Sequence, residues 1–136
     1  MIVVVDTNVW ISAILNKNGT PRVALEKALD VDVIAICDEL LQEIIDVLER
    51  KFSISPADTH NHLKLYIARA VYVTIDGTEQ GCRDSEDDMV IECAKKSRAD
   101  FIVTGDRDLL DMGSVEGIRI ITARQYIEGE LPLSVN

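Results

Sequence analysis

Short runs of mainly apolar residues, mostly β-branched, recur along the chain between longer segments of helical periodicity. The runs span residues 2–5, 33–36, 71–75, 101–103 and 118–121. A strand that is apolar on both faces is typical of a parallel sheet, because helices cover both sides of such a sheet. The alternation therefore predicts an α/β protein with three layers, α/β/α, around a mostly parallel sheet of about five strands.

Helices are predicted from their start signals and from apolar positions at helical spacing. Thr20 and Pro21 predict an N-cap and a first helical position, and Ser55 is expected to cap a later helix. Ser85 and Asp88 have the spacing of a capping box. We expect helices over residues 9–15, 22–29, 39–50, 89–97 and 123–127, besides the one that follows Ser55.

Length and cysteine usage bound the organisation of the chain. With 136 residues, we expect residues 1–136 to form a single domain. The cysteines, Cys37, Cys82 and Cys93, are odd in number and lack a C-x-x-C spacing. This favours a reducing, cytoplasmic setting without a disulfide framework. We expect neither a signal peptide nor a membrane span.

The net charge of −10 argues against general, long-range attraction to nucleic acid. It does not exclude an enzyme that acts on nucleic acid. Carboxylates that bind a cation contribute to this charge, and the bound cation would offset it. Basic groups close to a site could still hold phosphates.

Asp6 directly follows the first apolar run. In open parallel sheets, ligands bind beyond the carboxyl ends of the strands, so a carboxylate in this position is a candidate metal ligand. The alternative is a residue that ends the strand or caps the following helix, since Asp favours both positions.

A second run, residues 101–103, also ends in carboxylates, Asp106 and Asp108. We interpret Gly105 as a residue that permits close approach or unusual backbone angles at this corner. The alternative for Asp108 is an N-cap of the short helical segment that follows it.

Further carboxylates lie on predicted helices. Glu43 borders the apolar stripe of the 39–50 helix, and the alternative is an ordinary solvated position. Acidic residues also crowd the start of the 89–97 helix, where they could serve the helix dipole or bind a cation; they are Asp84, Glu86, Asp87 and Asp88.

An oxygen-only ligand set suits Mg²⁺ or Mn²⁺ better than zinc. The chain has neither a glycine-rich phosphate loop nor a dinucleotide fingerprint, and both histidines lie in one polar helical segment. These observations favour metal-assisted hydrolysis, most naturally of a phosphodiester.

The motifs around these acids resemble, in order and spacing, those of the PIN-domain ribonucleases, and more closely the VapC-like toxins of prokaryotic toxin–antitoxin pairs. They are Val5-Asp-Thr-Asn8, Glu39-Leu-Leu-Gln-Glu-Ile-Ile45, Arg83-Asp-Ser-Glu-Asp-Asp-Met89 and Thr104-Gly-Asp-Arg-Asp108, and the match covers nearly the whole chain. In the third motif, Ser85 replaces the family's proline.

The resemblance implies a PIN-like fold and a site whose acidic ligands hold one or two Mg²⁺ or Mn²⁺ ions. These ligands would be Asp6, Glu43, Asp88 and Asp106. The accessory candidates are Thr7, Asn8, Thr104 and Asp108, with Asp84 and Asp87, for which participation stays open.

The resemblance also implies cleavage of single-stranded RNA by a metal-bound water, a cognate antitoxin protein and a homodimer. Candidate phosphate contacts are Arg22, Arg50, Lys51 and Arg107, each of which could instead be plain surface charge. Trp10 is a candidate for a protein interface, and the alternative for it is a core position.

Two other readings compete with the nuclease. One is a PIN-like module that acts through protein partners, with weak or no nuclease activity; the acidic charge favours it, whereas a full set of four acids speaks against it. The other is a phospho-acceptor domain, but residues 33–36 and 71–75 offer no convincing acceptor aspartate and lysine pair.

Overall fold

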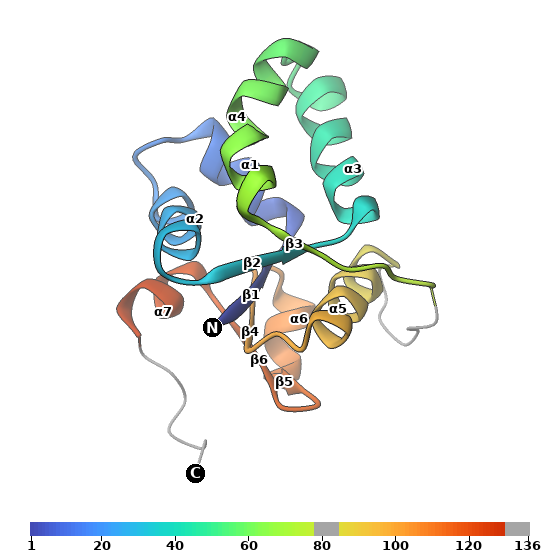
Figure 1. The fold of residues 1–136 in the computed structure, drawn as a ribbon. Coiled ribbons are helices and arrows are strands. Elements are labelled where there is room, and N and C mark those ends of the chain that lie inside the picture. The colour runs from blue at the N-terminus through green and yellow to red at the C-terminus, as the bar shows by residue number, and fades with distance from the viewer. Residues whose placement is uncertain (78–84, 130–136) are drawn as a thin grey trace.

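A six-stranded sheet runs through the middle of the molecule in the computed structural model, which describes residues 1–77 and 85–129 (Figure 1). The strands are β1 (Ile2–Val5), β2 (Val33–Ile36), β3 (Val71–Tyr72), β4 (Phe101–Val103), β5 (Ser114–Val115) and β6 (Ile118–Ile121). Their order is β3-β2-β1-β4-β6-β5. Every neighbouring pair is parallel except β5 and β6, so the predicted mostly parallel α/β sheet is confirmed.

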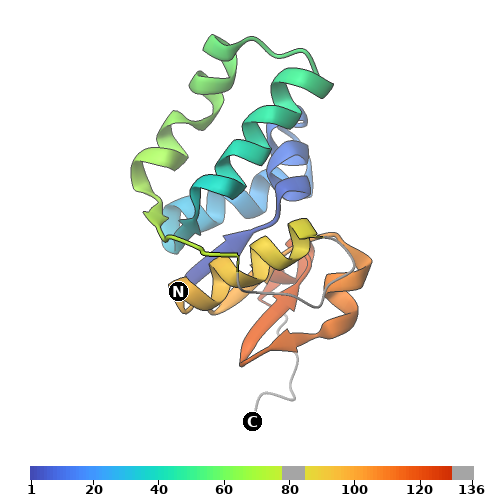
Figure 2. The same ribbon diagram turned by 90° about the vertical axis from the view of Figure 1, so that its right-hand side faces the viewer.

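Helices cover both faces of this sheet, as the three-layer prediction requires. They are α1 (Thr7–Leu15), α2 (Thr20–Val31), α3 (Asp38–Asp46) with its π-helical extension η1 (Val47–Lys51), α4 (Pro56–Arg69), α5 (Ser85–Ser97), α6 (Arg107–Met112) and α7 (Ala123–Glu128). Figures 1 and 2 show α1, α3 and α4 on one side of the sheet, and α5 and α6 on the other. Within the described ranges, no helix is both long and apolar enough to cross a membrane.

The central strands are buried because helices pack on both of their faces. Val3, Val4 and Ile102 are fully buried, and α5 packs against β1, β2 and β4. On the opposite face, Trp10 is 2% exposed and meets the ring of Tyr66 edge-on, with 5.4 Å between centroids. Trp10 is therefore a core residue, and its reading as an interface residue is wrong.

Several predicted boundaries shift. Gly19, not Thr20, is the N-cap of α2, whereas Ser55 caps α4 as expected and accepts a hydrogen bond from the Asp58 N–H at 3.1 Å. Ser85 is already the first residue of α5, whose cap lies outside the described residues. The third strand is shorter than predicted: after Val73 N–H donates to the Ile36 carbonyl (2.9 Å), the chain leaves the sheet.

The β5–β6 hairpin was not predicted. Its two-residue turn consists of Glu116 (φ 48°) and Gly117 (φ 83°), both in the left-handed region. Consecutive residues with positive φ match the mirror-image turns that join antiparallel strands, for which an acidic or amide residue followed by glycine is the usual signal. The dipeptide Glu116-Gly117 carried that signal in a weaker form.

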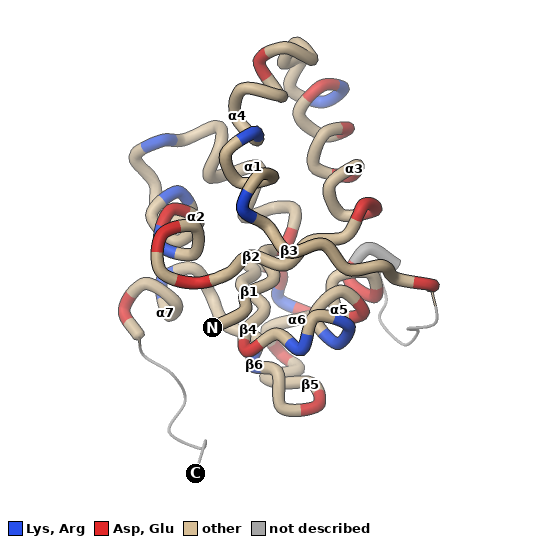
Figure 3. Tube along the Cα trace, viewed as in Figure 1, with Lys and Arg blue, Asp and Glu red and all other residues tan. Residues whose placement is uncertain are grey.

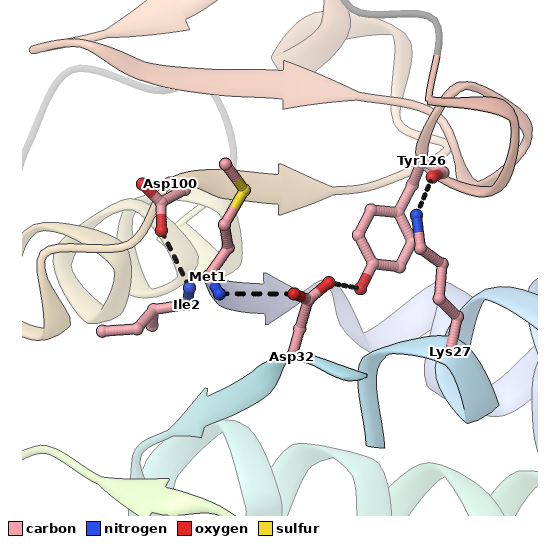
Figure 4. A network of polar contacts seen from close by, with 6 residues as sticks. All are labelled: Met1, Ile2, Lys27, Asp32, Asp100 and Tyr126. Atoms are coloured by element: carbon pink, nitrogen blue, oxygen red, sulfur yellow. Dashed lines mark hydrogen bonds and ion pairs between the residues drawn. The ribbon is translucent and has the colours of Figure 1, made fainter. Parts of the chain in front are cut away.

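A polar network holds together the amino ends of the central strands (Figure 4). Asp32, just before β2, accepts from the Met1 ammonium at 3.3 Å and from the Tyr126 hydroxyl. Asp100, just before β4, accepts from the Ile2 N–H at 2.8 Å. Lys27 donates to the Tyr126 carbonyl at 2.7 Å and lies 4.2 Å from the centre of its ring. The two carboxylates at this edge, Asp32 and Asp100, therefore have structural roles.

We predict that Tyr126→Phe lowers the free energy of unfolding at pH 7 by about 1–2 kcal/mol, because the Asp32 carboxylate loses the Tyr126 hydroxyl as a hydrogen-bond donor. Burial, and then the hydrogen bond to Asp32, raise the pKa of Tyr126. The folded state thus retains a proton that the unfolded chain loses above about pH 10, so this contribution is present below pH 10 and declines above it. Urea titrations should show that the difference in free energy of unfolding between wild type and variant is smaller at pH 10.5 than at pH 7. Tyr72→Phe, at an exposed position, is the control, and equal losses in both variants would contradict the role of the network.

Candidate functional site

The strand order creates a topological switch point between β1 and β4. From β1 the chain continues to β2 and β3 on one side, whereas β4 and β6 lie on the other. Ligands in such sheets bind beyond the carboxyl ends of the strands at the switch point. Val5 and Val103 are paired at the ends of the two strands, so Asp6 and Thr104 emerge side by side.

Asp6 is only 7% exposed and lies at the N-cap position of α1. Its backbone carbonyl accepts the first helical bonds, from Val9 and Trp10, but its side chain makes no capping bond. Instead, Oδ2 accepts a hydrogen bond of 2.7 Å from the Thr104 hydroxyl. Asp6 therefore ends the strand and holds the N-cap position, as the alternative had it, but its carboxylate bonds to Thr104 instead of capping the helix.

Thr104 connects the two strand ends. Its side chain is fully buried, and its hydroxyl donates to Asp6 while accepting from the Asp106 N–H at 3.0 Å. A single hydroxyl thereby orients the carboxylate that follows β1 and the backbone that carries the carboxylate after β4.

Asp106 is the N-cap of α6. Its Oδ1 accepts from the N–H groups of Asp108 (2.7 Å) and Leu109 (3.2 Å). Asp108 lies in the first turn of α6, so its interpretation as the cap is wrong. The prediction that Gly105 permits close approach or unusual backbone angles is also wrong, because its φ is not positive and a Cβ there would meet nothing within 4 Å.

Glu43 and Asp88 come from helices on opposite faces of the sheet. Glu43 lies on α3 beside the buried Ile44 and is half-buried, and α3 packs against both α1 and α5. Asp88 is half-buried in the first turn of α5, which packs on β1 and β4. Figure 2 shows α3 and α5 flanking β1, and Figure 3 shows acidic positions on α3 and at the start of α5 on the same side of the molecule.

The side chains at this edge are carboxylates and a hydroxyl, so their chemistry fits a hard cation such as Mg²⁺ or Mn²⁺. Within residues 1–77 and 85–129, no group of three or more His, Cys, Asp or Glu side chains is gathered closely enough to hold a metal ion. Hydrogen bonds connect Asp6 through the Thr104 hydroxyl to the backbone of Asp106.

The other predicted acids and the flanking polar residues differ in burial and in position. Thr7 is buried at the first position of α1, and Asn8 beside it is exposed. Asp87 is buried in the first turn of α5. Asp84 lies outside the described residues.

The candidate phosphate ligands also lie in different places. Arg107 is exposed at the first position of α6, directly after Asp106. Arg22 is engaged by Glu26 (3.1 Å) and by the Ala13 carbonyl (3.4 Å). Arg50 and Lys51 are exposed in η1, at the end of the α3 arm away from the sheet (Figure 1).

A pair of buried thiols near this edge was not predicted from the sequence. Cys37 is the N-cap of α3 and lies within hydrogen-bond reach of Cys93 on α5. A hydrogen bond from the Cys93 thiol and N–H groups of Leu40 and Glu39 lower the pKa of Cys37, whereas the same pairing and burial raise that of Cys93. Both thiols are free, and Cys82 lies outside the described residues. No cysteine motif indicated this contact.

Glu92 on α5 was also missed. It is 3% exposed and accepts hydrogen bonds from the N–H groups of Asp76 (2.6 Å) and Gly77 (3.0 Å). The signal was available: Glu92 stands one helical turn after Asp88, among the apolar residues Val90, Ile91 and Ala94.

Comparison with known proteins identifies the family. Residues 2–108 match the family described as PIN domain. The chain belongs to the PIN-domain family. Members of this family are nucleases.

A Methanocaldococcus jannaschii protein described as uncharacterized is 30% identical to this chain over 115 residues, which are 81% of this chain and 74% of that protein. A chain of the crystal structure of VapBC2 from Rickettsia felis, bound to a DNA fragment from its promoter, superposes with a TM-score of 0.62. This likeness covers 90% of the present PIN domain and 98% of the Rickettsia chain at 19% identity, so it supports the fold.

We predict that Thr104→Val destabilises the protein by about 1.5–3 kcal/mol, because the buried Asp6 carboxylate loses a hydrogen-bond donor while side-chain volume is preserved. Thr104→Ser retains the hydroxyl and should cost less, near the value of one buried methyl group, about 1 kcal/mol. Urea unfolding at pH 7 compares the two variants. A Val variant as stable as the Ser variant would show that the hydroxyl bond contributes little.

Proposed function

We propose that this PIN domain is a Mg²⁺- or Mn²⁺-dependent endoribonuclease that hydrolyses phosphodiester bonds of single-stranded RNA. The observation that carries the proposal is the Asp6–Thr104–Asp106 linkage at the switch point of the sheet. It sets two carboxylates at the edge where ligands bind, and one of them, Asp6, is buried there with its carboxylate held by the Thr104 hydroxyl.

Asp6, Glu43, Asp88 and Asp106 are the proposed ligands of one or two ions. Bound divalent cations supply activation of water and stabilisation of the leaving oxygen. Thr104 holds the Asp6 carboxylate in place, and the hydrogen bonds from Asp108 and Leu109 fix Oδ1 of Asp106. Thr7, Asn8, Asp84, Asp87 and Asp108 are proposed as accessory residues around these ligands.

Arg107 is the strongest of the proposed phosphate contacts. It is exposed and directly follows Asp106 in the chain, at the edge of the sheet where the proposed ligands Asp6 and Asp106 lie. Arg22 would have to leave Glu26 in order to bind a phosphate. Arg50 and Lys51 on η1 would contact RNA only farther from the ligands.

We further propose that residues 1–136 form one nuclease domain that acts in the cytoplasm as the toxin of a toxin–antitoxin pair. The resemblance of its motifs to VapC-like toxins and the similar fold in the VapBC2 structure support this role. An antitoxin protein and a second copy of the chain are the proposed partners. Exposed apolar residues on α1, α2 and α4 offer contact surface for a protein; they include Leu15, Val23 and Leu65.

The second candidate function is a PIN-like binding module with weak or no nuclease activity. The net charge of −10 favours it, because such a surface repels RNA at long range. The acids of the site favour the nuclease instead, because a protein-binding module has no need for a buried Asp6.

Cleavage of a panel of single-stranded RNAs with Mn²⁺ or Mg²⁺ tests the nuclease. We expect cleavage that EDTA abolishes and that Asp6→Asn reduces by about 100-fold or more, the upper range seen when groups around a metal are altered. Asp30→Asn, which removes an exposed carboxylate on α2, should leave the rate unchanged. Cleavage that survives both EDTA and Asp6→Asn would overturn the metal-dependent reading, and no cleavage of any RNA would favour the binding module.

Metal binding should also be visible without RNA. Carboxylates held near one another repel, and a cation that binds only the folded state stabilises it by mass action. At 100 times its dissociation constant, Mn²⁺ or Mg²⁺ should raise stability by about 2.7 kcal/mol, measured as an increase in melting temperature. Asp6→Asn should reduce this increase and Asp30→Asn should not. An unchanged melting curve at saturating metal would count against the site.

A further inference from the structure

Glu92 is a buried carboxylate whose two oxygens are engaged by backbone N–H groups of another segment. Oε2 accepts from Asp76 at 2.6 Å and Oε1 from Gly77 at 3.0 Å. The residue is 3% exposed in the middle of α5. A buried carboxylate is costly unless donors of this kind compensate it, so α5 and the Asp76–Gly77 turn depend on each other.

The face of α5 that contacts this turn also carries Asp88. Asp88, Glu92 and Lys96 are spaced four residues apart and therefore lie along one side of the helix. Lys96 Nζ lies 3.6 Å from Asp76 Oδ2, so it contacts the same turn one helical turn farther on. Figures 1 and 2 both show the chain after β3 running alongside α5.

The turn gives α5 a second attachment to the sheet. The helix packs on β1, β2 and β4 and buries Val90, Ile91, Cys93 and Ala94, and these apolar contacts select the buried face of the helix but are not directional. The Asp76–Gly77 turn follows β3, which is paired with β2, and its N–H groups are directional donors. Two directional bonds to one carboxylate fix the rotation of α5, and hence the direction of Asp88 one turn before Glu92.

We propose that Glu92 is a positioning residue for the acidic site: by binding the N–H groups of Asp76 and Gly77, it holds α5 so that Asp88 faces the carboxyl ends of β1 and β4. This inference rests on the proposed metal-dependent nuclease function. The proposed role of Glu92 does not include contact with metal or RNA.

Glu92→Gln is the informative substitution. The side chain keeps its size and one acceptor oxygen, but its NH₂ group opposes one of the two backbone N–H donors. Glu92→Asp keeps the charge and withdraws the acceptor by one carbon. Lys96→Gln is the matched control on the same helix face, because it removes only the half-exposed ion pair with Asp76.

Three measurements on each protein separate positioning from stability alone. Hydrogen exchange of the Asp76 and Gly77 amides should become faster in both Glu92 variants. Mn²⁺ affinity by calorimetry and kcat for RNA, both measured well below the melting temperature, should each fall about 10-fold in Glu92→Gln, as for other groups that orient metal ligands. KM for RNA should change less than about twofold, because phosphate contacts are retained. Lys96→Gln should match wild type.

The outcomes are distinct. If wild type neither binds Mn²⁺ nor cleaves RNA, the proposed function fails and the role of Glu92 fails with it. If wild type is active and both folded Glu92 variants retain its Mn²⁺ affinity and kcat, the Glu92 inference alone is overturned. Loss of the fold in both variants also overturns it, because Glu92 would then serve stability only.

Discussion

The hydrogen bond from Thr104 to Asp6 joins the ends of the two strands at the centre of the sheet. It depends on the parallel pairing of β1 with β4, which sets the residues after Val5 and Val103 beside each other. A carboxylate that is 7% exposed needs such a donor, and a hydroxyl can donate to it while accepting from the Asp106 backbone. The direction of Asp6, the start of α6 and the spacing of the two strand ends are thus coupled through one side chain.

The two edges of the sheet use carboxylates differently. At the amino edge, Asp32 accepts hydrogen bonds from the Met1 ammonium and the Tyr126 hydroxyl, and Asp100 accepts one from the Ile2 N–H (Figure 4). These bonds hold the amino ends of the strands together. At the carboxyl edge, Asp6 and Asp106 lie where the chain order switches sides and where two acidic helices converge. The same residue type therefore has a structural role at one edge and a proposed catalytic role at the other, and strand polarity distinguishes them.

Much of the fold could be predicted from the sequence because the strands of a sheet covered on both faces are mainly apolar. Residues 2–5, 33–36, 101–103 and 118–121 were assigned with their observed boundaries. Helix starts were less accurate, since Gly19 caps α2 by backbone geometry and has no side chain to signal it. The β5–β6 hairpin was missed because β5 has only two residues, of which Ser114 is polar.

For the site, strand ends were more informative than helices. The positions of Asp6 and Asp106 followed from the runs that precede them, but the bridging hydroxyl of Thr104 and the cap formed by Asp106 depend on atomic geometry that spacing does not contain. The partners of Glu92 could not be predicted, because its donors are backbone N–H groups of Asp76 and Gly77, and every residue except proline carries such a group. A contact of this kind leaves no trace in the partner's side chains.

The net charge of −10 is compatible with an RNA substrate once the roles of the acids are separated. Asp32, Asp100 and Glu92 are held by donors within the fold, so their charge is partly compensated in place. At physiological ionic strength the charge of distant exposed acids is screened beyond about 8 Å. Repulsion of a phosphate is then governed by the groups at the carboxyl edge, where divalent cations would reverse the local sign and Arg107 would add to it. If the proposed function holds, cation binding would precede RNA binding, because without a cation the acids at the carboxyl edge would repel a phosphate.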